Sequence, residues 1–370
     1  MWIQRFCVRR VRRAEIGPTN AAELRRTRPQ IRIVVLPIGE IMGQVTGISW
    51  TDHTFNPWIG CSKVHAGCMH CYAERDFDTR RGVAKWGIAG TRVKTSDDNW
   101  RKPLKWNRDA EAAGERRRVF CASLADVFES WGGGRVYDHN GQLLLKSYLG
   151  DARDTFDEIP DKWDQCTDKQ GWQPLELDDL RGDLFKLIDS TPHLDWLLLT
   201  KRPENVLKMW PRRGDYQYVA EAAEMNEFPM YRRDNVWLGT SVSDQATADE
   251  FVPRLLGCRD LCPVLFLSAE PLLDRINFRW AKWQSFSEQP GGVTDELDGL
   301  RRLDWIIAGG ESGGHFRQMM TEDVRLLRDQ CVSAGVPFFF KQWSGANPKV
   351  LGKELDGREW CEFPTSVVGV

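Results

Sequence analysis

The stretch from Trp305 to Phe340, WIIAGGESGGHFRQMMTEDVRLLRDQCVSAGVPFFF, contains one complete strand-helix-strand unit. The apolar run Trp305 to Ala308 stops at a glycine-rich polar turn. The amphipathic segment Thr321 to Ala334 predicts a helix, because it has a threonine N-cap, acidic residues in its first turn and Gly335 just past its end. A second apolar run, Val336 to Phe340, follows. This order predicts two parallel strands joined by a helix.

The same order recurs along the chain. Short apolar runs, each suited to burial on both faces, alternate with amphipathic segments such as Gln245 to Leu256. The further predicted strands are Gly47 to Trp50, Val119 to Ala122, Trp196 to Leu199, Val236 to Gly239 and Val264 to Leu267. This alternation predicts an α/β protein, a partial (β/α)6-type barrel of parallel strands with outer helices. A doubly wound open sheet is the alternative.

Polar residues follow the predicted strands directly. In both architectures, active-site groups lie at the carboxyl ends of the strands. The candidate site residues are therefore Ser123, Asp126, Thr200, Lys201, Arg202, Ser241, Ser243, Asp244, Ser268, Glu270 and the turn Gly309 to Gly313, which includes Glu311.

Three cysteines lie close together after the first predicted strand, in Cys61-Ser-Lys-Val-His-Ala-Gly-Cys68-Met-His-Cys71, with no fourth cysteine nearby. Three thiolates that hold an iron-sulfur cluster leave one iron open to an outside ligand, which implies chemistry at that iron. A structural zinc ion normally takes four protein ligands. Zinc is the alternative, with His53, His65 or His70 as its fourth ligand.

The remaining cysteines are scattered, and several fall in apolar runs where a free cysteine packs as a small hydrophobe. A chain of this size needs no disulfide framework, and no secretory signal is recognisable. We therefore expect a reducing, cytoplasmic environment.

Composition excludes several classes of protein. The 370 residues are 41% hydrophobic and 28% charged, which is typical of a soluble globular protein. A formal net charge of -2 argues against a protein that coats nucleic acid by bulk electrostatics. The best candidate for a membrane span, Ile33 to Ile38, is short and contains Pro37, so we predict no membrane span.

The chain divides into three parts by composition. Residues 1–41 form a basic, arginine-rich extension, and we interpret Met42 as the translation start. Residues 42–345 form the predicted barrel, with an insertion at about 130–174 that is rich in Asp, Lys and Gly. Residues 346–370 form a C-terminal tail.

A three-cysteine loop after the first strand of a β/α barrel resembles the radical S-adenosylmethionine superfamily. Six residues separate Cys61 from Cys68, whereas most members place three there. Five further motifs are similar to a phage- and prophage-associated family of uncharacterised radical-SAM-like proteins, over about residues 46–345. They are Ile48-Ser-Trp-Thr-Asp52, Asn56-Pro-Trp-Ile-Gly-Cys61, Leu199-Thr-Lys-Arg-Pro203, Leu267-Ser-Ala-Glu-Pro271 and Gly309-Gly-Glu-Ser-Gly313.

The resemblance implies a 4Fe-4S cluster on Cys61, Cys68 and Cys71 and S-adenosylmethionine as cofactor. A reductant such as flavodoxin or ferredoxin would reduce the cluster, which would cleave S-adenosylmethionine to a 5'-deoxyadenosyl radical that abstracts hydrogen from substrate.

The resemblance also implies roles at the strand ends. Ser123 and Asp126 would bind the methionine amino group, and Lys201 or Arg202 its carboxylate. Ser241, Ser243 and Asp244 would bind ribose hydroxyls, with Glu270 as a further acceptor. Glu311 would face cofactor or substrate, and His70 or Tyr72 would stack on adenine.

The substrate is open at this stage. Trp58 and Trp343, with Lys201, Arg202 and Lys341 at the same face, favour a nucleotide or nucleic acid. One rival function is a zinc-binding protein that recognises nucleic acid without catalysis. Another is a hydrolase or nucleotide-modifying enzyme that uses Asp126, Glu270 and Glu311, with the cysteines merely structural.

Overall fold

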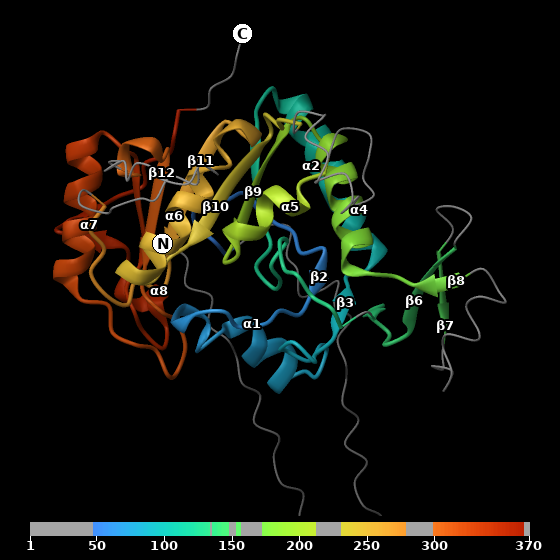
Figure 1. The fold of residues 1–370 in the computed structure, drawn as a ribbon. Coiled ribbons are helices and arrows are strands. Elements are labelled where there is room, and N and C mark those ends of the chain that lie inside the picture. The colour runs from blue at the N-terminus through green and yellow to red at the C-terminus, as the bar shows by residue number, and fades with distance from the viewer. Residues whose placement is uncertain are drawn as a thin grey trace, which may run out of the picture. The chain divides into compact units, whose positions relative to one another are not determined.

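The computed structural model describes residues 47–133, 135–147, 153–156, 172–211, 231–278 and 299–365, all within the compact unit Ile38–Val370. Seven strands form a parallel sheet that curls into a half-barrel (Figure 1). Their spatial order is β1 (His53–Thr54), β4 (Arg117–Cys121), β9 (Leu194–Thr200), β10 (Val236–Ser241), β11 (Val264–Ala269), β12 (Trp305–Gly309) and β13 (Phe338–Gln342).

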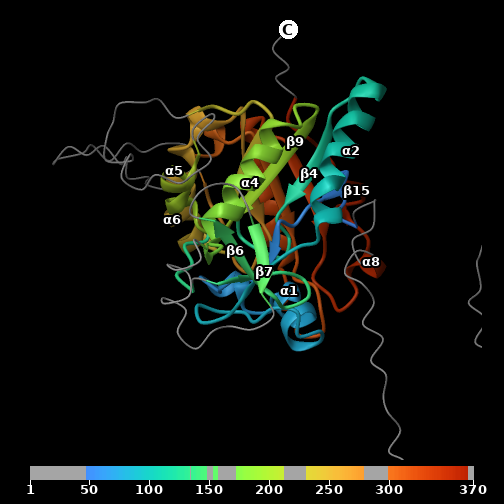
Figure 2. The same ribbon diagram turned by 90° about the vertical axis from the view of Figure 1, so that its right-hand side faces the viewer.

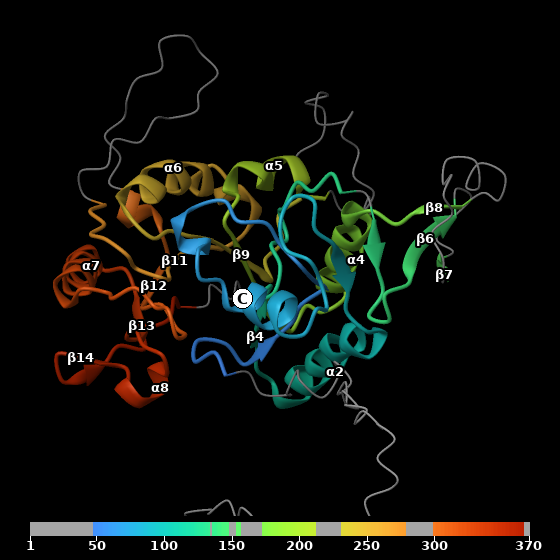
Figure 3. The same ribbon diagram turned by 90° about the horizontal axis from the view of Figure 1, so that it is seen from below.

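Helices cover the outer face of this sheet, as Figure 3 shows for the view along the half-barrel. They are α2 (Asp97–Ala113), α4 (Leu177–Asp189), α5 (Val206–Met209), α6 (Gln245–Leu256) and α7 (Thr321–Ala334). Figure 2 shows α2 and α4 beside β4 and β9. Every neighbouring pair of strands in the sheet is parallel. The predicted α/β partial barrel is confirmed.

Short elements complete the described unit. The helices are α1 (Tyr72–Glu74) and α8 (Pro348–Leu351), with a π-turn η3 (Arg75–Thr79) after α1. The 3-10 turns are η2 (Ala66–Cys68), η4 (Pro203–Asn205), η6 (Arg259–Leu261) and η7 (Gly299–Arg302). No helix among the described residues is both long and apolar enough to cross a membrane.

Alternate strand residues enter two different apolar cores, because side chains along a strand point to opposite faces in turn. On β12, Ile306 and Ala308 pack with the outer helices, whereas Trp305 and Ile307 join an inner aromatic layer. Gly239 on β10 makes room for that layer, since a Cβ there would lie 2.5 Å from the Phe266 ring. The inner layer fills the half-barrel below the carboxyl ends of its strands.

The first predicted strand, Gly47 to Trp50, is wrong. The amide of Thr51 bonds back to the Ile48 carbonyl at 3.3 Å, so the chain turns there and enters the sheet only at β1. Trp50 instead joins the inner layer, with its ring 4.7 Å from the Phe120 ring.

The predicted bounds of α6 and α7 are confirmed. The N-cap predicted for α7 is wrong, because Met320 occupies that position without a side-chain hydrogen bond and Thr321 is already helical. Gly335 takes the left-handed conformation at the C-terminal end, as its position after the helix predicted.

A second, smaller sheet lies beside the half-barrel. It contains β2 (Trp58–Ile59), β3 (Arg92–Lys94), β5 (Val136–Tyr137), β6 (Leu143–Ser147), β7 (Arg153–Phe156) and β8 (Trp172–Pro174). The last four fall in or at the edge of the interval predicted as an insertion. Near the C-terminus, β14 (Glu354–Leu355) and β15 (Arg358–Glu359) form a hairpin. The predicted extension 1–41 lies outside the described residues.

Candidate functional site

A cavity of about 430 Å³ lies at the carboxyl ends of the half-barrel strands. The strand residues that continue the inward-facing positions of the inner aromatic layer also form the wall of this cavity. Lys201 lies two residues after inner-layer neighbour Leu199, and Lys341 lies two after Phe339. The predicted site residues that line the cavity are Cys61, Cys68, His70, Cys71, Tyr72, Ser123, Asp126, Lys201, Ser241, Ser268, Glu270, Gly310, Glu311, Ser312 and Lys341.

The cysteine loop, residues Cys61 to Cys71, closes one side of this cavity. All three thiols are free and partly exposed. The turn η2 is capped by the His65 ring, whose Nδ1 accepts from the Gly67 amide at 3.0 Å. Gly67 packs tightly against the end of β10, since a Cβ there would lie 2.2 Å from Ser243 Oγ. A residue with a side chain at this position would push the loop away from the sheet.

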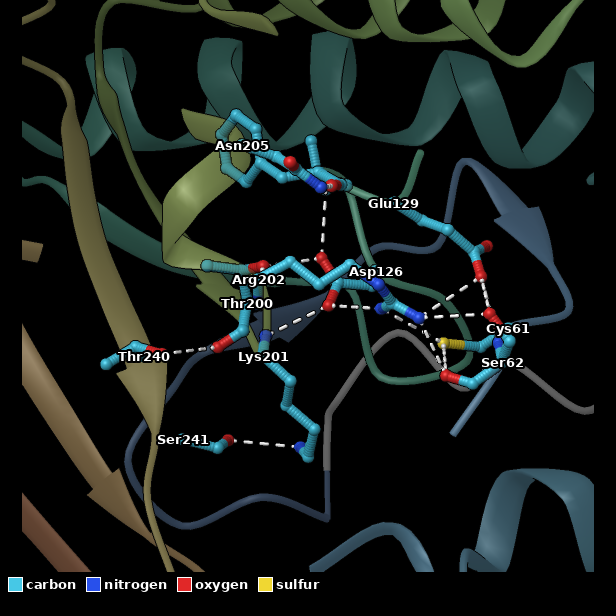
Figure 4. A network of polar contacts seen from close by, with 12 residues as sticks. Cys61, Ser62, Asp126, Glu129, Thr200, Lys201, Arg202, Asn205, Thr240 and Ser241 are labelled. Carbon is cyan, nitrogen blue, oxygen red and sulfur yellow. Dashed lines mark hydrogen bonds and ion pairs between the residues drawn. The ribbon is translucent and has the colours of Figure 1, made fainter. Parts of the chain in front are cut away.

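Arg202 joins the amino-terminal end of the cysteine loop to the strand ends (Figure 4). Its Nη1 donates to Asp126 Oδ2 at 2.8 Å and lies 3.7 Å from Cys61 Sγ, and its Nη2 donates to the Ser62 carbonyl at 2.7 Å. The guanidinium is therefore a structural link to the loop and does not line the cavity. The expectation that Arg202 neutralises a cofactor carboxylate does not fit this geometry.

Glu129 completes this buried network. It accepts from the Ser62 amide at 2.9 Å and forms an ion pair with Arg92 at 2.8 Å and with Arg202 at 3.3 Å. Two guanidinium groups thus balance the carboxylates of Asp126 and Glu129. Removal of one partner from such a buried network typically costs about 3–5 kcal/mol, because it leaves a charge unpaired.

Both carboxylate oxygens of Asp126 accept hydrogen bonds within this network. Its Oδ1 accepts from Thr200 Oγ1 at 2.7 Å and its Oδ2 from the Lys201 amide at 2.9 Å, in addition to Arg202. The predicted role of Asp126 as acceptor for a methionine amino group therefore competes with contacts that it already makes.

Glu311 forms a second network at the other end of the cysteine loop. Its Oε2 accepts from the Arg317 amide at 2.7 Å and lies 3.1 Å from His70 Nδ1. Its Oε1 accepts from Arg317 Nη2 at 2.5 Å. Burial opposes ionisation of Glu311, but the hydrogen bonds from Arg317 and His70 outweigh it and lower the pKa of this carboxyl. Arg317 Nη1 also donates to the Ala66 carbonyl at 3.0 Å.

A third ion pair lies on the cavity wall between β11 and β13. Lys341 Nζ lies 2.8 Å from Glu270 Oε1, and Ser268 Oγ donates to Glu270 Oε2 at 3.0 Å. Lys201 differs, because its Nζ contacts Ser241 Oγ at 3.1 Å and it forms no ion pair with a described residue. Lys201 therefore presents a cavity-facing ammonium group without a carboxylate partner in the described part of the chain.

Hydroxyl groups on the opposite wall have partners within the protein. Ser123 Oγ accepts from Asn56 Nδ2 at 3.0 Å, and the Ser123 carbonyl accepts from Tyr72 Oη at 2.9 Å. Both Ser123 and Tyr72 line the cavity. His70 and Tyr72, the two expected adenine-stacking residues, thus both reach the site, on either side of Cys71.

Two predicted ribose-binding residues do not line the cavity. Asp244 is the N-cap of α6, where its Oδ1 accepts from the Thr247 amide at 2.8 Å. Ser243 is buried beneath Gly67. The sequence around Asp244 is typical of a helix N-cap, since an aspartate directly before an amphipathic segment is a preferred cap.

The predicted aromatic platform is wrong in its residues. Trp58 is fully buried in the core beneath the second sheet, and Trp343 packs with its ring 4.9 Å from the Phe340 ring. Neither lines the cavity. Trp50 and Trp86 do.

The three thiols fit a metal-bound role by their chemistry. Burial raises the pKa of Cys61 to about 12, with Glu129 and Asp126 adding to the rise, and burial also raises the pKa of Cys71. Both thiols are therefore protonated without a cation, and a metal would replace those protons. No group of three His, Cys, Asp or Glu side chains within the described ranges is arranged to hold a single metal ion. A cluster, which offers a separate iron to each thiolate, needs no such convergence.

The histidines considered as a fourth zinc ligand have other roles. His53 stacks on Trp106 at 4.2 Å, and His65 caps η2. Burial lowers the pKa of His65 to about 4, and Lys201 adds to that effect. His70 alone faces the cavity, through its contact with Glu311.

Four residues of these networks were not predicted from the sequence: Ser62, Arg92, Glu129 and Arg317. Ser62 lies in the cysteine loop already singled out, so its position was a usable signal, whereas Arg317 lies four residues after the turn Gly309 to Gly313. Glu129 and Arg92 lie outside those segments, and only the folded chain brings them to Arg202.

A family model described as "Protein of unknown function (DUF5131)" matches residues 45–132 and 176–364. These segments make up more than half of the chain, so the chain belongs to this family. The unmatched interval between them overlaps the interval predicted as an insertion. Comparison with curated proteins and with solved structures gives no match.

Proposed function

We propose that this chain is a radical S-adenosylmethionine enzyme, similar to phage-associated radical-SAM-like proteins, that holds a 4Fe-4S cluster through Cys61, Cys68 and Cys71. The observation that carries the proposal is that all three thiols line one cavity at the carboxyl ends of a curled parallel sheet. The bound cluster would pass one electron, taken from a reductant such as flavodoxin or ferredoxin, to S-adenosylmethionine and so start hydrogen abstraction from the substrate. A reducing, cytoplasmic location is part of this proposal.

The residues of the cavity wall support binding of a zwitterionic cofactor. The Lys201 ammonium is available to neutralise a carboxylate. The Glu270 carboxylate, already paired with Lys341 and Ser268, is a candidate acceptor for an amino group by exchange of one of these contacts. The inner aromatic layer below the cavity, which includes Trp50 and Phe120, limits water at the reacting centre.

A nucleotide or nucleic acid is the proposed substrate class. Trp86 and Tyr72 line the cavity and offer aromatic faces for base stacking. Lys201 lines it without a carboxylate partner among the described residues and provides a cation for an anionic ligand. Lys63 and Lys341 line it as well, each in an ion pair with a glutamate. This set replaces Trp58 and Trp343 as the basis of the proposal.

The hydrolase alternative has less support from the geometry. Its three carboxylates are each in an ion pair, Asp126 with Arg202, Glu270 with Lys341 and Glu311 with Arg317. A carboxylate held by a guanidinium or ammonium group must give up that ion pair before it can contact a substrate proton.

The test is cleavage of S-adenosylmethionine. The protein is reconstituted anaerobically with iron and sulfide and reduced with dithionite, and 5'-deoxyadenosine is measured by chromatography. We expect the wild type and Cys361→Ala, which changes an exposed cysteine outside the cavity, to form the product, and Cys71→Ala to form none. A colourless protein that binds zinc and forms no 5'-deoxyadenosine would instead support the non-catalytic, zinc-binding alternative.

A further inference from the structure

The cysteine loop is tied to the half-barrel at three separate residues. Ser62 is held by Glu129 and Arg202. Ala66 is held through its carbonyl by Arg317, and His70 through its ring by Glu311. These contacts at Ser62, Ala66 and His70 involve both backbone and side-chain atoms, so they restrict the backbone path of the loop as well as its side chains.

The second and third ties come from one ion pair. Arg317 and Glu311 share three hydrogen bonds, from the Arg317 amide, Nε and Nη2. Glu311 is buried and lies two residues after the end of β12, so its position depends on the sheet. The Glu311–Arg317 pair therefore fixes Ala66 and His70 of the loop relative to the end of β12.

The two tied positions are next to the cysteines. Ala66 lies two residues before Cys68, and His70 lies directly before Cys71. The Cys68 and Met69 amides bond back to His65 and Ala66 at 2.9 and 3.1 Å, which forms a compact turn between the ties. Movement of Ala66 or His70 would displace the Cys68 or Cys71 sulfur.

We propose that Glu311 is a positioning residue that, together with Arg317, preorganises Cys68 and Cys71 before any metal is bound. The role differs from the cofactor contact expected for Glu311 from the sequence. It rests on the proposed function only in the identity of the metal group, because the order of the loop is a property of the metal-free protein. Preorganisation of this kind reduces the ordering cost of loading a metal site.

The test is hydrogen exchange and thiol alkylation in the metal-free protein. Glu311→Gln should raise the exchange rate of amides 66–70 and the alkylation rates of Cys68 and Cys71 by about tenfold, as expected for loss of a charge-assisted hydrogen-bond network. Arg317→Met should act in the same way. The double variant should add little to either single change, because both break one unit.

Two controls separate positioning from general stability. Glu322→Gln makes the same chemical change at an exposed position in the first turn of α7, and it should leave both rates unchanged. Exchange in β9 to β12 and the urea midpoint should also stay unchanged in Glu311→Gln. Iron bound per chain after reconstitution should fall in Glu311→Gln and partly recover in the charge-conserving variant Glu311→Asp.

Unchanged exchange and alkylation in both Glu311→Gln and Arg317→Met would overturn the proposal. So would a loss of protection that extends through the sheet, because it would assign the pair to overall stability. A wild-type protein with an ordered loop and no cleavage of S-adenosylmethionine would contradict the proposed function alone, since the metal-free readouts do not depend on it.

Discussion

At the scale of single residues, charge pairing decides which side chains are available in the cavity. The Asp126, Glu270 and Glu311 carboxylates each have a cation within ion-pair distance. The Lys201 ammonium group contacts Ser241 Oγ and forms no ion pair within the described ranges. In a partly enclosed cavity, an ammonium group without a counter-ion attracts an anionic ligand more strongly than it does in bulk water.

Lys201→Met should therefore weaken binding of S-adenosylmethionine while it leaves the fold intact. Loss of one charge-assisted contact predicts a Kd increase of about tenfold, which is about 1.4 kcal/mol. Isothermal titration with the reconstituted protein measures this change. Lys208→Met, at an exposed position near the end of α5, is the matched control and should bind as the wild type does. An unchanged Kd in Lys201→Met would remove Lys201 from the site.

Residue positions in the site were predictable where they depend on strand alternation. Lys201, Ser241 and Glu270 follow apolar strands, and the carboxyl ends of parallel strands meet at one edge. Asp244 shows the limit of that reasoning, since it follows a strand but caps the next helix. Arg202 shows another limit, because its partner Glu129 becomes visible only through tertiary contacts.

At the scale of elements, long periodic segments were predicted better than short ones. The bounds of α6 and α7 follow from their apolar spacing and from Gly257 and Gly335 at their ends. The strand β1 has only two residues, and its position depends on pairing of His53 with Val119. Such a short strand carries no periodic signal, so the prediction fell on the apolar residues before it.

The hairpin β14–β15 is attached to α7 by ion pairs. Asp356 takes a positive φ of 55° and Gly357 one of 77°, which suits a two-residue hairpin turn. Asp356 Oδ1 accepts from Arg325 Nη2 at 2.5 Å, and Arg328 pairs with the same carboxylate. Hydrogen bonds from Arg325 and Arg328 lower the pKa of Asp356 to about 2.

This attachment should depend on pH with a defined sign. The folded pKa lies below the unfolded value of about 3.9, so the stabilisation is present above that value and is lost as pH falls toward 2. Asp356→Asn keeps the turn and should raise hydrogen exchange in residues 354–359 by on the order of twofold to fivefold at pH 5. The ratio of variant to wild-type exchange should approach one at pH 2. A ratio that is already one at pH 5 would show that the ion pairs do not hold the hairpin.

At the scale of the whole described unit, three features meet at one end of the half-barrel. A cysteine loop, an ammonium group and an aromatic inner layer surround one cavity. The fold class and the place of the cysteines were predictable, because buried apolar runs that alternate with helices have few stable arrangements. The ion pairs that fix the loop were not, since they join residues far apart in the chain, such as His70 and Glu311.

The measurement that tests the central claim most directly is electron paramagnetic resonance of the reconstituted, dithionite-reduced protein, recorded with and without S-adenosylmethionine. The proposal predicts a reduced 4Fe-4S signal in the wild type that changes when S-adenosylmethionine is added, because the cofactor binds the open iron. It predicts no such signal in Cys71→Ala. A cluster signal that S-adenosylmethionine leaves unchanged, or bound zinc in place of iron, would contradict the proposal.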